Sequence, residues 1–155
     1  MIPVYRIFAS RFSKTAMSGI EAERAGGRWN SPSRPVVYAS GSLCLAVLEI
    51  LVNVDDAELV LDSFSYIEAK LPKDIPMTRV EDKALPLDWR AYEHPWCKEM
   101  GDAWLAKAET AVLMVPSAVL PQESNYLLNP VHPDFAGLRA LAPRPIDFDP
   151  RLISR

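Results

Sequence analysis

The sequence predicts an α+β domain, and three observations support this prediction. Runs rich in β-branched residues are interleaved with only two stretches of firm helical pattern, an arrangement typical of α+β proteins. The chain contains 14 prolines, so its helices and strands must be short. Its 155 residues suit one domain, and no internal repeat or low-complexity tract marks a boundary. We therefore expect a single domain over residues 1–155.

The first half of the chain contains two expected strands and one expected helix. Residues 4–8 have the pattern of a strand. Residues 10–26 are polar and rich in small side chains, which predicts a loop or a short helix that ends at a glycine pair. Residues 35–40 form a β-branched run typical of a buried strand. Ser42 is a suitable N-cap for a helix over residues 43–53.

The middle of the chain is less regular. Asp55 and Asp56 predict a turn, and residues 59–71 predict one or two further strands. Residues 72–95 are dominated by Pro, Asp, Lys and Arg, a composition that indicates a long surface connection. Apolar side chains lie near one face of residues 96–109, which predicts a second helix.

The carboxy-terminal part is expected to complete the sheet. Residues 110–115 predict a strand that enters a proline-bounded segment dense in Ser, Asn and His. Residues 145–152 are expected to close the sheet with one more strand.

The overall charge argues against some classes of function. The formal net charge is -3 and the pI is near 5.4, whereas binding to nucleic acid or to an anionic membrane favours a basic surface. No apolar stretch approaches the ~20 residues that span a bilayer. The first residues lack the basic start and the long apolar core of a signal peptide. We therefore expect a cytoplasmic protein with no direct nucleic-acid or membrane partner.

The cysteines and histidines favour neither a disulfide nor a metal site. Cys44 and Cys97 are far apart and form no CxxC pair. Cys44 lies in an apolar run, where a buried free thiol is expected. His94 and His132 do not have the spacing of metal ligands with either cysteine, so no metal is expected.

Glu49 is the only charged residue between Leu43 and Val54. On a helical wheel, residues 43–52 are apolar nearly all round, so we expect this helix to be packed on both sides. A lone buried carboxylate would cost several kcal/mol unless it is paired or hydrogen-bonded. Two interpretations stay open at this point. Glu49 is structural, either in an ion pair with Arg28 or Arg6 or at an edge position that touches water, or it stands at the floor of a polar pocket.

The residues before Glu49 favour the pocket. Gly26 and Gly27 allow a sharp backbone turn in front of Arg28, whose planar guanidinium suits a phosphate. Tyr38 follows a β-branched pair, so its ring is either core or the wall of a cleft. Together the three side chains suit a ligand with a phosphate, a flat ring and a ribose. No GxGxxG and no P-loop is present to bind a nucleotide by another route.

Three blocks in fixed order resemble the RES domain: GGRWNSPSRPVVYAS, LAVLEILVN and VPSAVLPQESNYLLNPVHPDF. The resemblance covers nearly the whole chain. It implies an ADP-ribosyltransferase-like fold, with central β-sheets flanked by a few helices. It also implies a toxin that consumes NAD, with an antitoxin that carries a Xre-like helix-turn-helix as its partner.

The resemblance also assigns residues. Arg28, Tyr38, Glu49 and Ser117 match the arginine, tyrosine, glutamate and serine of the family. It implies that Arg28 grips the NAD diphosphate, that Tyr38 stacks on nicotinamide and that Glu49 faces the nicotinamide ribose. Ser117 would position a phosphate, the ribose or an attacking group. For Asn125, pocket lining and hydrogen bonding at a turn or strand end both stay open.

The resemblance leaves several functions open. The leading one is cleavage of the nicotinamide–ribose bond of NAD by hydrolysis or phosphorolysis, with NAD as substrate and no prosthetic group. The alternatives are a protein ADP-ribosyltransferase and a non-catalytic subunit that seats its antitoxin. ADP-ribosyltransferases usually carry their glutamate late in the chain, whereas Glu49 lies early and on a helix, so water, inorganic phosphate and protein all stay open as acceptors. A homodimer within the antitoxin complex also stays open.

Overall fold

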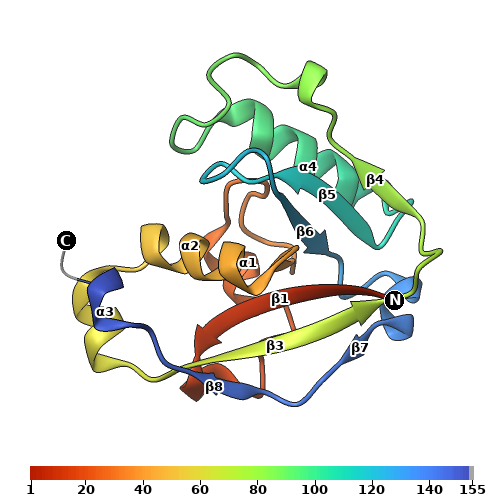
Figure 1. The fold of residues 1–155 in the computed structure, drawn as a ribbon. Coiled ribbons are helices and arrows are strands. Elements are labelled where there is room, and N and C mark those ends of the chain that lie inside the picture. The colour runs from red at the N-terminus through yellow and green to blue at the C-terminus, as the bar shows by residue number, and fades with distance from the viewer. Residues whose placement is uncertain (154–155) are drawn as a thin grey trace.

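A single curled sheet dominates the protein, in a computed structural model that describes residues 1–153. The strands are β1 (Ile2–Ala9), β2 (Val37–Ser40), β3 (Phe64–Leu71), β4 (Met77–Arg79), β5 (Val112–Pro116), β6 (Ser124–Leu128), β7 (Arg139–Ala140) and β8 (Arg144–Ile146). The helices are α1 (Ile20–Ala25), α2 (Leu43–Asn53), α3 (Asp56–Leu61) and α4 (Pro95–Lys107). Figure 1 shows α2 and α4 on different parts of this sheet. The α+β class is as predicted.

The sheet consists of two arms that meet at one point. Its strand order is β4-β5-β6-β2-β1-β3-β7, and β8 also pairs with β3. The β1–β3 ladder runs the full length of both strands, from Ile2 opposite Leu71 to Ala9 opposite Phe64. By contrast, β1 and β2 share the single register pair Tyr5 and Ser40. The sheet is therefore weakly joined between β1 and β2, and Figure 1 shows β1 and β3 diverging from β5 and β6.

Side-chain caps explain where the helices begin. The Ser42 hydroxyl accepts from the Leu45 backbone N–H at 3.1 Å, which confirms the predicted cap and the helix over residues 43–53. In the same way, the Nδ1 of His94 accepts from the Trp96 N–H, and Pro95 occupies the first helical position of α4. The short helix α1 ends at Gly26, as the sequence predicts.

Residues 59–61 are helical, so the prediction that residues 59–71 are all strand is wrong at its start. Asp55 does not simply turn the chain, because its carboxylate accepts from the Glu58 N–H at 2.9 Å and caps α3. The β-branched and leucine side chains that follow suit either structure. The acidic cap decides between them, and the strand begins only at Phe64.

Helix α2 is packed on one side, not on both as predicted. Cys44 is exposed rather than buried, and both Leu48 and Val52 are exposed on the same helix. The inner side packs against β1 and β2 through side chains such as Leu45 and Ala46. The helical wheel could not separate the two sides because the outer side is apolar as well.

The connection over residues 72–95 is more structured than its composition indicates. Strand β4 lies within it and pairs with β5 in parallel. Trp89 is buried and packs against Trp29 beside α4, with ring centroids 6.3 Å apart. At the other end of the sequence, the expected last strand over residues 145–152 is shorter and earlier, at Arg144–Ile146, and a 3-10 turn follows at Pro150–Leu152.

Among the residues that the structure describes, no helix has the length and apolar character needed to cross a membrane.

Candidate active site

A cleft of about 1080 Å³ opens where β1 and β2 diverge. Its walls come from both strands, from α2, from the turn after α1 and from the segment around residue 90. Four of the five residues that the sequence singles out line it: Arg28, Tyr38, Glu49 and Asn125. The fifth, Ser117, is fully buried and does not line the cleft.

Glu49 is held by two neutral donors. Its Oε1 accepts from the Ser117 hydroxyl and from the Asn125 amide, each at 2.7 Å. Neither Arg6 nor Arg28 pairs with it, since Arg6 pairs with Glu21 and Arg28 donates to backbone carbonyls. Within residues 1–153, no donor is hydrogen-bonded to Oε2. The carboxylate therefore has no cationic partner among these residues and leaves one oxygen for a ligand in the cleft.

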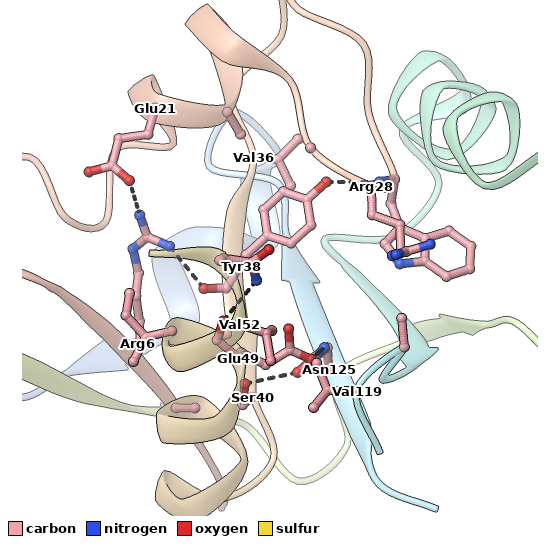
Figure 2. A pocket seen from close by; sticks show the side chains of 18 of the residues that line it. Arg6, Glu21, Arg28, Val36, Tyr38, Ser40, Glu49, Val52, Val119 and Asn125 are labelled. Carbon is pink, nitrogen blue, oxygen red and sulfur yellow. Dashed lines mark hydrogen bonds and ion pairs between the residues drawn. The ribbon is translucent and has the colours of Figure 1, made fainter. Parts of the chain in front are cut away.

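Ser117 and Asn125 fix the direction of these bonds. The Ser117 oxygen accepts from the N–H groups of Val119 and Leu120 at 3.1 Å each, so its single proton is directed to Glu49. The Asn125 Oδ1 accepts from the Ser40 hydroxyl at 2.8 Å, so its NH₂ group is directed to Glu49. Ser40 and Asn125 are register partners on β2 and β6, and Figure 2 shows this chain of contacts. Asn125 thus lines the cleft and also forms hydrogen bonds to Glu49 and Ser40.

Tyr38 has its ring in the cleft wall and its hydroxyl buried under the glycine turn. The hydroxyl donates to the Asn30 Oδ1 at 2.6 Å and accepts from the Trp29 N–H at 3.1 Å. Burial raises the pKa of Tyr38 well above its usual value, so the phenol stays neutral and can donate. A Cβ on Gly27 would lie 2.6 Å from the Tyr38 oxygen, so only glycine allows this approach. Both interpretations of Tyr38, core and cleft wall, therefore hold in part.

Arg6 supplements the short backbone ladder between β1 and β2. Its guanidinium donates to the Tyr38 carbonyl at 3.1 Å and to the Glu21 carboxylate at 2.9 Å (Figure 2). It also donates to the Ala16 carbonyl at 2.8 Å. Burial lowers the pKa of Arg6, and the ion pair with Glu21 opposes that effect. Arg6 thus lines the cleft, and its guanidinium joins the two strands to α1.

Arg28 holds a segment of backbone at the end of the cleft. One terminal nitrogen, Nη1, donates to the carbonyls of Trp89 and Ala91 at 3.1 and 3.0 Å, and Nη2 donates to the carbonyl of Arg90 at 3.3 Å. This segment also places Arg90 in the cleft lining, together with Arg28 and Arg6. The sequence did not indicate Arg90, because residues 72–95 carry no periodic pattern that would distinguish it from other surface arginines.

Comparison with known proteins connects this geometry to one family. The sequence matches the RES domain over residues 3–149. "Toxin Res" of Photorhabdus laumondii subsp. laumondii is 39% identical over 133 residues, which are 85% of this chain and 84% of that protein. "Prs ADP-ribosylating toxin" of Sphingobium sp. is 33% identical over 150 residues, which are 95% of this chain and 92% of that protein.

A solved structure shares the fold. A chain from the M. tuberculosis MbcT–MbcA toxin–antitoxin complex is similar with a TM-score of 0.78, over 97% of this chain and 85% of that one. The sequences are 19% identical, so the likeness concerns the fold alone. It confirms the expected arrangement of a central sheet flanked by a few helices.

Proposed function

Because the chain belongs to the RES domain family, we propose that it is the toxin of a toxin–antitoxin pair and that it cleaves the bond between nicotinamide and ribose in NAD. The names of its relatives support the first part, since two of them are Toxin Res and an ADP-ribosylating toxin. The second name also supports NAD as the substrate, because ADP-ribosylation draws its ADP-ribosyl group from NAD. We propose no prosthetic group.

The environment of Glu49 is the observation that carries this proposal. When the glycosidic C–N bond breaks, its electron pair moves to the nicotinamide nitrogen and positive charge develops on the ribose. A preoriented carboxylate stabilises that charge, and the stabilisation is strongest in the transition state. Two neutral donors orient Glu49 without neutralising it, and Oε2 has no donor among the described residues. An arginine partner would have weakened the same effect.

The rest of the cleft suits the remaining parts of NAD. Its volume of about 1080 Å³ is slightly above the usual range for ligand sites, which suits a ligand as large as a dinucleotide. We place nicotinamide against the Tyr38 ring, the adjoining ribose at Glu49 and the diphosphate at the cationic end formed by Arg28 and Arg90. Ser117 then acts through Glu49 as a positioning residue, because it is buried behind the carboxylate.

Three acceptors are compatible with this site. Attack by water gives ADP-ribose and a proton, and attack by inorganic phosphate gives a phosphorylated ADP-ribose. Transfer to a protein is the second candidate function, and the specific observation in its favour is the match to the ADP-ribosylating toxin of Sphingobium sp.. A purely binding role is the least supported, since it would not need the network around Glu49.

We also propose an antitoxin with a Xre-like helix-turn-helix as partner, whose carboxy-terminal end fills the cleft near Arg28. The MbcT–MbcA complex supports an antitoxin of some kind. The partner would bind DNA in place of this acidic chain. A cytoplasmic location and a homodimer within the complex belong to the same proposal.

One experiment separates these outcomes. The purified chain is incubated with NAD, with and without phosphate or a lysate, and mass spectrometry follows nicotinamide, ADP-ribose, its phosphorylated form and modified proteins. We expect free nicotinamide together with a soluble ADP-ribosyl product. A modified protein as the main product would favour the second candidate. Absence of nicotinamide release under every condition would contradict both enzymatic functions.

A further inference from the structure

The backbone of residues 89–91 is fixed to the cleft by Arg28. Both terminal nitrogens of that guanidinium donate to carbonyls of the segment, at 3.0 to 3.3 Å. Behind the segment, Trp89 is buried, and the Cys97 thiol donates to the Trp89 carbonyl at 3.6 Å. The segment is therefore attached from the cleft side and from the core side.

These contacts restrict what Arg28 can do for a ligand. A phosphate binds an arginine best when it receives two parallel N–H bonds from the planar guanidinium. In Arg28 three of the five N–H groups, including both on Nη1, already serve carbonyls, so a phosphate would have to displace the segment to bind across the two terminal nitrogens. The displaced carbonyls would then lose charged donors, each of which contributes more than a neutral one.

Arg90 has the opposite arrangement. Its Nε donates to the Ala118 carbonyl at 2.8 Å, which fixes the side chain across the end of the cleft. Its two terminal nitrogens have no hydrogen-bond partner within the described residues, and the side chain is exposed and lines the cleft. The guanidinium is thus oriented by one bond while its outer edge remains available.

We propose that Arg90 makes the direct contact with the diphosphate of the dinucleotide, and that Arg28 is the positioning residue that holds Arg90 in place. The proposal rests on the proposed function, because it concerns the diphosphate end of the same cleft. Glu93 lines the same end and is exposed, so its carboxylate disfavours an anion there. Binding of the diphosphate therefore needs a bidentate contact with Arg90 to offset the repulsion from Glu93.

The test compares two ligands that divide NAD between them. ADP carries the diphosphate without nicotinamide, and nicotinamide riboside carries nicotinamide without the diphosphate. Their dissociation constants are measured by calorimetry for the unmodified chain and for Arg90→Ala, Arg90→Lys and Arg28→Lys. Arg34→Ala is the matched control, since Arg34 is exposed and does not line the cleft. Melting temperatures verify that each variant is folded.

We expect Arg90→Ala to weaken ADP binding roughly ten- to a hundredfold, the loss typical of hydrogen bonds to a charged group. Nicotinamide riboside should bind as before. Arg90→Lys should recover only part of the ADP affinity, because an ammonium cannot give two parallel bonds. Arg28→Lys should weaken ADP selectively and should also speed amide exchange over residues 89–91, as expected when the segment is released.

Two results would overturn the inference. The first is that the Arg90→Ala variant binds ADP as tightly as the Arg34→Ala control does. The other is Arg28→Lys that loses ADP binding while exchange over residues 89–91 is unchanged, which would make Arg28 the direct contact. A different result would show that the proposed function is wrong while the inference about Arg90 holds. In that case ADP binding would depend on Arg90, but no nicotinamide would be released from NAD.

Discussion

At the scale of single residues, the partners of Glu49 determine what its replacement does. A carboxylate paired with a buried arginine would leave that cation unpaired when replaced, at a cost of about 3–5 kcal/mol. Glu49 is instead bonded to a hydroxyl and an amide, both neutral, and both donate to the same oxygen. An amide oxygen at that position can accept the same two bonds. The charge of Glu49 is therefore not needed for the fold.

We predict that Glu49→Gln folds normally and binds NAD, but turns it over far more slowly. Loss of one preorganised electrostatic contact costs about 3 kcal/mol in the transition state, on the order of a hundredfold in rate. Thermal melting and nicotinamide release, measured on the same preparation, test this. A variant that melts much earlier while its folded fraction keeps full turnover would show that Glu49 is a structural residue.

Ser117→Ala provides the complementary case. This change removes the donor to Glu49 and also the acceptor of two backbone N–H groups in a buried position. We expect both a lower turnover and a loss of about 1–3 kcal/mol in unfolding free energy. In the double variant with Glu49→Gln, the losses of turnover should be less than additive, since both residues act on one carboxylate. Fully additive losses would contradict a shared role.

At the scale of elements, the turn after α1 packs closely against strand β2 where Gly27 meets the Tyr38 side chain. A methyl group there would meet the oxygen and the ring of Tyr38 at 2.6 and 2.8 Å. We predict that Gly27→Ala destabilises the fold by about 1–3 kcal/mol, the usual cost of overpacking, and lowers NAD turnover by moving the Tyr38 ring. Denaturant unfolding and nicotinamide release measure the two effects.

Gly137→Ala is the matched control for this prediction. Its Cβ would meet only Pro72, at an ordinary 3.7 Å, and Gly137 lies outside the cleft. It should leave both stability and turnover nearly unchanged. Equal effects from the two substitutions would mean that the fit between Gly27 and Tyr38 has no special importance.

Elements with a strong local signal could be predicted from the sequence, and those that depend on tertiary contacts could not. The helix after Ser42 follows from its cap and its apolar run. Strand β4 could not be found, because three residues acquire strand structure only through pairing with β5. The motif blocks indicate Glu49 and Ser117, but the burial of Ser117 depends on how the loop after β5 folds back. Arg90 carries no local signal at all.

At the scale of the whole molecule, the cleft lies across the shortest ladder in the sheet. Among the described residues, β1 and β2 share one register pair, and the Arg6 side chain adds a hydrogen bond to the Tyr38 carbonyl. A ligand in the cleft touches residues of both strands and so links the two arms. A ligand at a hundred times its dissociation constant stabilises the bound state by about 2.7 kcal/mol.

We therefore predict that ADP-ribose slows amide exchange in both strands beside the cleft, over residues 5–7 and 38–40. If opening requires release of the ligand, the effect reaches the order of a hundredfold at that saturation. Hydrogen exchange read by mass spectrometry tests this, with residues 139–146 as an internal control outside the cleft. Protection confined to one strand would contradict the linking of the two arms.

The hydrogen bond between Asn125 and Glu49 can form only late in the synthesis of the chain, because ribosomes add residues from the amino terminus. These residues are 76 positions apart. At about 5–20 residues per second, Asn125 is added roughly 4–15 seconds after Glu49. Until then β2 also lacks β6, the strand with which it forms its longer ladder. A chain that has not yet reached β6 thus carries the carboxylate without the Asn125 amide that orients it, and a toxic activity would begin only after β6 has been added.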